Sequence, residues 1–421
     1  MAKKIIIDTD PGIDDVLGLL LALSATPEEV EVLLISLTFG NIEVNNCLRN
    51  AVSMFHILER EMQWRREKGR PEGFGALRAH RPIIAVGAEN PLEDQKLLAD
   101  YFHGTDGLGG IHDSHPHLTP TEAWEHLFHT TIDQEGIPSA TTSDKERAFA
   151  PSKLPAYKEI LRALRDNEKD SVTLVAVGPL TNLALAAAED PETFLRVKEV
   201  VVMGGAINKP GNVTPVGEFN AYADAVAAAR VFALTSPNPH TTVPPTRSAK
   251  LPPYPAKLSR TLTLRLFPLD ITLRHNLSRG QFREAITPLL AGGSPLAEWV
   301  DAFMGHTFKT LERLHPGHEG DDAQLSLHDP VCIWYAITAE DPKWLPSQNS
   351  PEDIRIDTLG QWTRGMCVVD RRNRHRIEGE EETSSDHGLW LSGSAGNRIW
   401  RMDGSPAEEN FGEILMQRLF N

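Results

Sequence analysis

The chain has few cysteines, few aromatic residues and no excess of positive charge. Its 421 residues contain three cysteines, 7% aromatic residues, and 42 Lys plus Arg against 58 Asp plus Glu, which gives a formal net charge of −16. Cys47, Cys332 and Cys367 lie far apart and form no CxxC pair, so the sequence predicts reduced thiols in an intracellular protein and excludes a disulfide framework. The negative charge disfavours nucleic acid and acidic membrane surfaces as partners. A small neutral substrate, or a cation held by carboxylates, fits this charge better.

Long hydrophobic runs are also missing. The apolar run at the start of the chain, Ile5 to Ile7, is followed directly by Asp8 and Asp10. Such a run is too short for a signal peptide or a membrane span. We therefore expect a cytoplasmic protein with no membrane partner. The composition, with 40% hydrophobic and 24% charged residues, is typical of a globular protein with a large core.

Short apolar runs alternate with helical patterns along the chain. Expected strands cover residues 5–7, 30–38, 83–86, 172–177 and 200–203, and expected helices cover 14–24, about 44–60 and an Ala-rich stretch after 182. This alternation predicts an α/β fold with an open, mostly parallel β-sheet flanked by helices. In such sheets ligands bind outside the carboxyl ends of the strands.

Four polar or Pro-rich segments interrupt the alternation, near residues 61–80, 112–156, 236–261 and 370–397. Strand–helix units resume after each of them. We therefore interpret them as surface insertions in a single domain spanning residues 1–421. A linker between two domains at 112–156 is the alternative interpretation.

Four carboxylates, those of Asp8, Asp10, Asp14 and Asp15, lie within eight residues at the end of the first strand. Carboxylates this close repel one another unless a cation lies among them. Oxygen ligands suit a hard divalent ion, calcium or magnesium, and not zinc. In the plainer interpretation, Asp14 and Asp15 complement the helix dipole and Asp8 caps the turn.

Two later blocks also carry polar groups. Asn212, Glu218 and Asn220 lie in a Gly- and Pro-constrained loop and are suited to hydrogen-bond several sugar hydroxyls, although a polar surface loop would look the same. His328-Asp329-Pro330 precedes an apolar run and predicts a helix start with Asp329 as N-cap. The ordinary pKa of histidine lies near neutrality, so His328 is also a candidate general acid.

Taken together, these motifs resemble the inosine–uridine-type nucleoside hydrolase family. The stretch Asp8-Thr9-Asp10-Pro11-Gly12-Ile13-Asp14-Asp15 is similar to the family signature almost letter for letter. In order along the chain, the resemblance also rests on Gly40-Asn41, His103-Gly104-Thr105-Asp106-Gly107-Leu108-Gly109, Gly178-Pro179-Leu180-Thr181-Asn182, Met203-Gly204-Gly205, the 212–220 block and His328-Asp329-Pro330. It implies calcium-dependent hydrolysis of the N-glycosidic bond of ribonucleosides, such as uridine or inosine, to ribose and free base.

The resemblance also implies a role for each matching residue. Asp10, Asp15, Asp329 and the backbone carbonyl of Val177 would bind calcium, and Asp10 would also be the general base that activates water. His328 would assist the leaving base. The substrate-binding residues implied are Asp14, Asn41, Asn212, Glu218, Asn220 and, more loosely, His103. Because members of the family usually form homodimers or homotetramers, a homo-oligomer is expected on the same ground.

The sequence departs from the family pattern in places. Gly217 stands where a small Ala is expected, and the usual Asp-Pro helix start after Asn220 is reduced to Asp224. These departures, with the weak match between 236 and 326, leave base preference open. Two other functions remain as alternatives. A haloacid-dehalogenase-like phosphatase also has Asp-x-Asp after a first strand, but normally Thr or Val where this chain has Gly12. A non-catalytic ribose- or calcium-binding module would be expected to lack Asp10 or Asn220.

Overall fold

A large, mostly parallel sheet lies at the centre of the computed structural model, which describes residues 2–93, 95–121, 124–128, 147–244, 251–314, 317, 319–372, 374 and 386–421. In these ranges nine strands follow the order β10-β13-β7-β6-β5-β1-β2-β3-β4. Among the described strands of this sheet, only the edge pair β10–β13 is antiparallel. The predicted α/β class with a mostly parallel sheet is confirmed. The strands are β1 (Lys3–Thr9), β2 (Val30–Leu37), β3 (Ile83–Val86), β4 (Ala150–Pro151), β5 (Val172–Ala176), β6 (Glu199–Met203), β7 (Leu264–Phe267), β10 (Leu345–Pro346) and β13 (Trp400–Gly404).

Apolar side chains on both faces of the sheet explain why β1 is a central strand. Ile5 and Ile7 belong to one buried cluster and Ile6 to the other, because successive side chains of a strand point to opposite faces. Strands buried on both faces have near-continuous apolar runs, as here. Two further pairs form small antiparallel sheets: β8 (Asn276–Ser278) with β9 (Gln324–Ser326), and β11 (Arg355–Ile356) with β12 (Cys367–Val368).

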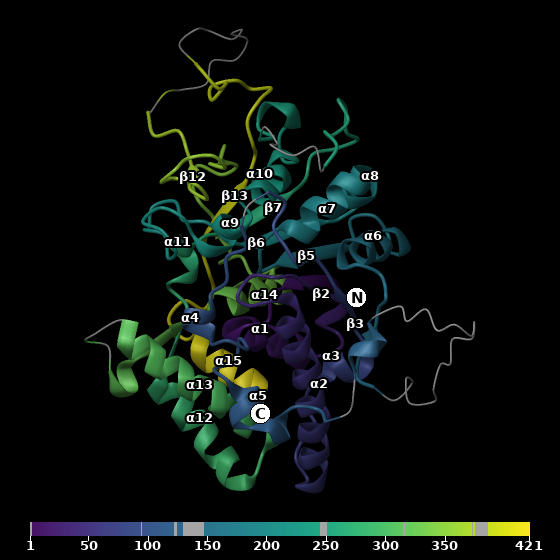
Figure 1. The fold of residues 1–421 in the computed structure, drawn as a ribbon, viewed down its shortest axis with the longest axis vertical. Coiled ribbons are helices and arrows are strands. Elements are labelled where there is room, and N and C mark those ends of the chain that lie inside the picture. The colour runs from purple at the N-terminus through teal and green to yellow at the C-terminus, as the bar shows by residue number, and fades with distance from the viewer. Residues whose placement is uncertain are drawn as a thin grey trace.

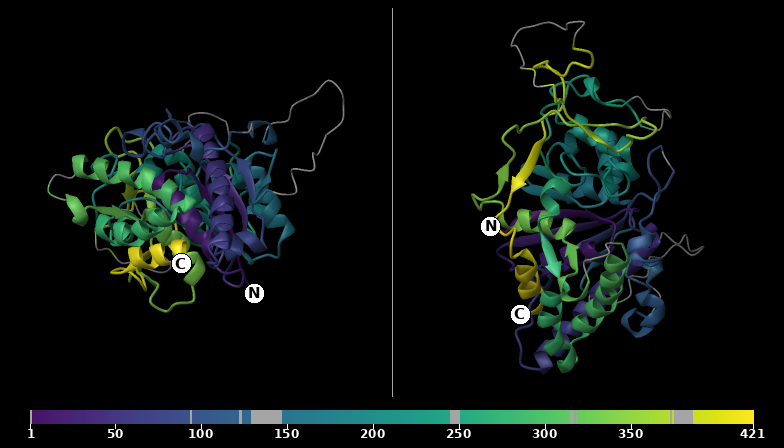
Figure 2. Two further views of the ribbon diagram at one scale, coloured as in Figure 1. Left: turned by 90° about the horizontal axis from the view of Figure 1, so that it is seen from below. Right: turned by 90° about the vertical axis from the view of Figure 1, so that its left-hand side faces the viewer.

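Helices cover both faces of the sheet (Figures 1 and 2). The lower group in Figure 1 comprises α1 (Ile13–Ser24), α2 (Val44–Glu67), α12 (Arg279–Gly292), α13 (Pro295–Leu314), α14 (His328–Thr338) and α15 (Phe411–Phe420). The upper group comprises α6 (Ala156–Asp166), α7 (Thr181–Glu189), α8 (Pro191–Phe194) and α10 (Ala225–Ala233). Short helices in the connections are α3 (Gly75–Ala79), α4 (Asp100–His103), α5 (Ile111–Ser114), α9 (Phe219–Ala223) and α11 (Leu269–Thr272).

Helix α2 extends seven residues beyond the expected end at Arg60, into the first charged segment. In this continuation Glu61 and Arg65 are buried. Arg65 Nε donates to Glu61 Oε1 at 2.7 Å, and Arg65 Nη2 donates to the Leu419 carbonyl at 2.9 Å. The Arg65 guanidinium, oriented by Glu61, therefore joins α2 to the end of α15. The charge of the segment, read from the sequence alone, gave no sign of this burial.

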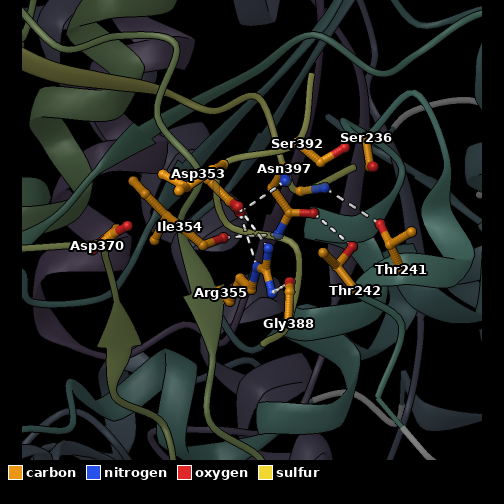
Figure 3. Close-up of polar contacts among 12 residues, drawn as sticks. Ser236, Thr241, Thr242, Asp353, Ile354, Arg355, Asp370, Gly388, Ser392 and Asn397 are labelled. Carbon is orange, nitrogen blue, oxygen red and sulfur yellow. Dashed lines mark hydrogen bonds and ion pairs between the residues drawn. The ribbon is translucent and has the colours of Figure 1, made fainter. Parts of the chain in front are cut away.

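Hydrogen bonds around Asn397 connect the end of the fourth predicted insertion, residues 370–397, to the rest of the protein (Figure 3). Asn397 donates to the Ile354 carbonyl at 2.7 Å and accepts from the Thr242 hydroxyl at 2.7 Å. Beside it, the Arg355 guanidinium pairs with Asp353. Parts of three predicted insertions, residues 122–123 and 129–146, 245–250, and 373 and 375–385, lie outside the described residues. No helix in the described part of the chain is both long and apolar enough to cross a bilayer.

Candidate active site

The Asp-rich turn lies at the carboxyl end of β1, where the chain enters α1. Asp15 organises this turn, since its carboxylate accepts hydrogen bonds from the Thr9 hydroxyl at 2.6 Å and from the Gly12 N–H at 3.1 Å. All four carboxylates are at most 8% exposed. Helix capping therefore accounts for part of the role of Asp15, but capping alone does not require four buried acids.

Asp10 is held in a close-fitting recess by the loop after β2. The Asn41 N–H donates to Asp10 Oδ2 at 2.7 Å, and the Asn41 side-chain amide donates to Asp15 Oδ2 at 2.7 Å. A side chain at Gly178 would bring a Cβ within 2.5 Å of Asp10 Oδ1, and one at Gly40 would collide with Oδ2. Asp10 Oδ1 is buried and has no hydrogen-bond partner among the described residues. A buried, unpartnered carboxylate oxygen is costly unless a cation or water satisfies it.

Asp14, Asp15 and Asp329 form a buried carboxylate cluster. Each offers one oxygen atom, and these atoms lie within 4.8 Å of one another. Burial, followed by repulsion from Asp15, raises the pKa of Asp14 to about 7. Burial also raises the pKa of Asp329 well above its usual range, with repulsion from Asp14 and Asp15 adding to the effect. A divalent cation among these oxygens would stabilise the charged carboxylates against both their burial and their mutual repulsion. The all-oxygen donor set fits a hard ion such as calcium.

Asp329 reaches this cluster from the first turn of α14. The helix begins at His328 and its N-cap is Leu327, so the expectation that Asp329 is the N-cap is wrong. Helices α1 and α14 pack together, and a Cβ at Gly18 of α1 would be only 3.6 Å from the Asp329 carbonyl carbon. The close packing of these two helices brings an acid from late in the chain to the turn after β1.

Val177 and Asn220 meet at the neighbouring strand ends. The Asn220 side-chain amide donates to the Val177 carbonyl at 2.7 Å and, more weakly, to the Met203 carbonyl at 3.3 Å. Val177 follows β5 and Met203 ends β6, so one side chain joins the ends of two adjacent strands. The Val177 carbonyl keeps a second lone pair, which remains available to a further partner.

Glu218 caps the short helix α9. Its carboxylate accepts from the N–H groups of Asn220 at 2.9 Å, Ala221 at 3.0 Å and Gly205 at 2.7 Å. The Asn212 side-chain oxygen accepts from the Phe219 N–H at 2.8 Å. Both predicted ribose-binding side chains therefore order their own loop, and both also line the cleft above the carboxylates.

His328 lies beside Asp329 and lines the same cleft. Its Nδ1 lies 2.8 Å from the hydroxyl of Thr272, at the end of α11. Burial lowers the pKa of His328 to about 4. The expectation of a near-neutral pKa is therefore wrong, and at neutral pH the ring is uncharged and carries a single proton.

His103 lines the cleft from α4. Its Nδ1 accepts from the Ile13 N–H at 3.1 Å, and burial lowers its pKa to about 3. The glycine-rich loop that follows is organised by Asp106, whose carboxylate accepts from the N–H groups of Leu108, Gly110 and His112. The His103 ring is thus neutral and fixed against the start of α1.

The cleft measures about 830 Å³ and has an apolar side that the motifs did not reveal. Tyr101, Leu273 and Leu314 line it although they are 54%, 40% and 41% exposed. Further lining residues on this side are Phe102, Leu311 and Leu325, with the polar Asn276, Gln324 and Ser326 from β8 and β9. Large exposed apolar side chains at a cleft mark a surface that binds something. The missed signal was the apolar spacing Leu311–Leu314 at the end of α13, which looks like ordinary core spacing in sequence.

The sequence of this chain matches a known protein family and curated members of it. The family model of the inosine-uridine preferring nucleoside hydrolases matches residues 5–388. The pyrimidine-specific ribonucleoside hydrolase RihA of Klebsiella pneumoniae is 30% identical over 376 residues, which cover 88% of this chain and 89% of RihA.

Solved structures agree at the level of the fold. A plant nucleoside hydrolase, the PpNRh1 enzyme, has a TM-score of 0.63 at 21% identity, covering 99% of both chains. A purine-preferring ribonucleoside hydrolase from Gardnerella vaginalis has a TM-score of 0.65 at 20% identity, covering 99% of this chain and 98% of that one.

Proposed function

Because the chain belongs to the inosine-uridine preferring nucleoside hydrolase family and is a hydrolase of N-glycosyl bonds, we propose that it releases the base from ribonucleosides in a calcium-dependent reaction. The observation that carries this proposal is the buried cluster of Asp14, Asp15 and Asp329 beside the unpartnered Oδ1 of Asp10. Asp14 and Asp329 line the polar end of a cleft large enough for a nucleoside.

Asp10, Asp15, Asp329 and the Val177 carbonyl are our proposed calcium ligands, and Asp14 is close enough to contribute as well. Burial of these acids without a cation would be costly, which supports a resident ion. Calcium would supply positive charge that neutralises the acids and orients water and ribose hydroxyls. The assignment predicts one ion per chain.

Asp10 is our proposed general base. Breaking the C–N bond develops positive charge on the ribose ring while water attacks, as in other glycoside hydrolyses. Asp10 would take the proton of that water, because its Oδ2 is held by the Asn41 N–H and its Oδ1 has no partner among the described residues. General-base assistance is typically worth about 10² to 10⁴ in rate.

The substrate hydroxyls would be bound by Asp14, Asn41, Asn212, Glu218 and Asn220. All five line the cleft, and most are already fixed by hydrogen bonds to the protein, so the site is ordered before substrate arrives. Pre-ordered groups contribute to rate where their contacts tighten toward the transition state.

The departing base would receive a hydrogen bond from His328, and His103 also lines the cleft. Each ring is neutral at neutral pH, and each has its Nδ1 engaged, by the Thr272 hydroxyl and the Ile13 N–H respectively. The apolar side of the cleft would pack against the face of the base. RihA is pyrimidine-specific, and the Gardnerella enzyme prefers purines. We propose uridine and inosine as the first substrates to examine.

A chromatographic screen for free base tests this function. Common ribonucleosides are incubated with the protein and calcium, and the Asp10→Asn variant serves as the control for contaminating activity. Release of uracil or hypoxanthine by the wild type but not the variant is the expected result. Release of phosphate from phosphorylated substrates instead would support the phosphatase, and tight ribose binding without base release would support the non-catalytic module.

A homodimer or homotetramer and a cytoplasmic location complete the proposal. Exposed apolar side chains away from the cleft, such as Trp362 at 78% and Leu359 at 51%, support self-association. Light scattering coupled to size-exclusion chromatography measures the oligomeric state, and a monomer at micromolar concentration would contradict it.

A further inference from the structure

Thr272 occupies a buried position directly behind His328. It is the last residue of α11, the short helix that follows β7, and its side chain is 0% exposed. A hydroxyl buried among apolar groups costs free energy unless it forms a hydrogen bond. Its bond to His328 Nδ1 at 2.8 Å therefore matters both for the hydroxyl and for the ring.

The direction of this hydrogen bond follows from the partners of the hydroxyl. Among the described residues, the Thr272 hydroxyl forms its side-chain hydrogen bond with His328 alone. If Nδ1 carried the ring proton, the hydroxyl would accept it and its own proton would be left without an acceptor. If the hydroxyl donates, both groups are satisfied, and the single proton of the neutral ring is on Nε2.

The same contact fixes the rotation of the ring. A histidine side chain has a broad, roughly two-fold preference about its last torsion, so the two sides of the ring exchange easily when nothing holds them. The hydroxyl behind Nδ1 favours one of these two orientations. His328 lines the cleft, so this orientation leaves Nε2 on the side away from Thr272.

We propose that Thr272 is a positioning residue that holds the His328 ring with Nδ1 as acceptor and Nε2–H available to the departing base. The inference rests on the proposed function, in which His328 assists the leaving group. A neutral histidine donates a hydrogen bond from only one of its two ring nitrogens, so the residue behind the ring determines whether Nε2 can donate to the departing base. For histidines that bind a metal, loss of the partner behind the ring typically costs about tenfold to a hundredfold in activity, and we expect an effect of that order here.

A purely structural role for Thr272 is the alternative. The adjoining turn also supports the start of α14, because the His275 carbonyl accepts from the Leu327 N–H at 2.7 Å. If a substitution at Thr272 displaced this turn, it would also displace the start of α14, and with it Asp329 and the proposed calcium site. It would then affect all substrates alike, whereas loss of ring positioning affects only substrates whose leaving group needs help.

Thr272→Val tests the inference, because valine keeps the shape and removes the hydroxyl. Thr272→Ser restores the hydroxyl. Thr307→Val is the matched control, since Thr307 is also 0% exposed but its hydroxyl donates within its own helix, to the Phe303 carbonyl at 2.9 Å. Rates are measured on uridine, on inosine and on a nitrophenyl riboside, whose phenolate leaves without assistance, each over a calcium titration.

We expect Thr272→Val to lower kcat on both nucleosides about tenfold to a hundredfold, with little change on the nitrophenyl riboside or in the calcium requirement. Thr272→Ser should recover most of the loss, and Thr307→Val should match the wild type. Equal losses on all three substrates, no loss, or no recovery with serine would overturn the inference. A wild-type protein that releases no base from any nucleoside would instead contradict the proposed function.

Discussion

Asp10 and Asn41 are joined by a backbone hydrogen bond that makes the two oxygens of one carboxylate different. The Asn41 N–H donates to Asp10 Oδ2 at 2.7 Å, whereas Oδ1 is buried without a partner among the described residues. One oxygen is therefore fixed by the protein and the other is left for an ion or water. This asymmetry is what a carboxylate needs if it is both to be held in place and to accept a proton.

Replacing Asp10 by Asn should therefore reduce turnover by at least about 10² while the protein stays folded, because an amide cannot take a proton from water. The measurement is kcat on uridine, with circular dichroism to confirm the fold. Asp8→Asn is a matched control, since Asp8 is also buried but lies within β1, where it accepts from the Asn182 side-chain amide of α7 at 2.9 Å. Near-normal turnover by Asp10→Asn with calcium bound would show that another group is the base.

Replacing His328 by Ala should affect substrates according to how poorly their base leaves. Uridine and inosine should lose about 10² or more in kcat/KM, the scale of lost assistance to a leaving group, and a nitrophenyl riboside far less. Both are measured at saturating calcium. The same loss on both substrates would show that His328 acts through the neighbouring Asp329 and not on the leaving group.

Calcium should stabilise the protein more at pH 8 than at pH 5. The pKa of Asp14 in the metal-free fold is about 7, against an ordinary value of 3.8. Between these values the folded protein binds more protons than the unfolded chain, so the free energy of unfolding falls as pH rises. Calcium binds the deprotonated acids and removes that penalty, in competition with protons. The increase in Tm on adding calcium, measured at several pH values, checks this, and an increase independent of pH would contradict it.

Apolar contacts at the mouth of the cleft should contribute to binding the base. Leu273→Asn and Leu314→Asn should each raise KM for uridine and inosine by about tenfold, with kcat nearly unchanged. Leu345→Asn is the control, because Leu345 is 57% exposed on the edge strand β10 and does not line the cleft. Unchanged KM in both cleft variants would show that the base binds elsewhere.

Much of the fold was predictable from local sequence. The apolar run Ile5 to Ile7 and the Gly- and Pro-bearing turn after it correctly placed a buried strand with acids at its carboxyl end. The position of Asp329 in the carboxylate cluster was not predictable from spacing alone, because it reaches the cluster through the packing of α14 on α1.

Two other features depended on burial and could not be read from residue types. The pKa of His328 falls to about 4 because the ring is buried in the folded protein. Thr272 gave no signal at all, since a lone threonine after an apolar strand is common. Thr272 lies near His328 because α11, which follows β7, ends beside the start of α14 in the folded protein.

The central claim is that calcium held by these acids is required for base release. The most direct measurement is the rate of uracil and hypoxanthine release by protein that has been stripped of metal, verified metal-free and then titrated with calcium. We expect no detectable turnover without metal and full recovery at one calcium per chain. Full hydrolysis of uridine or inosine by the metal-free protein would contradict it.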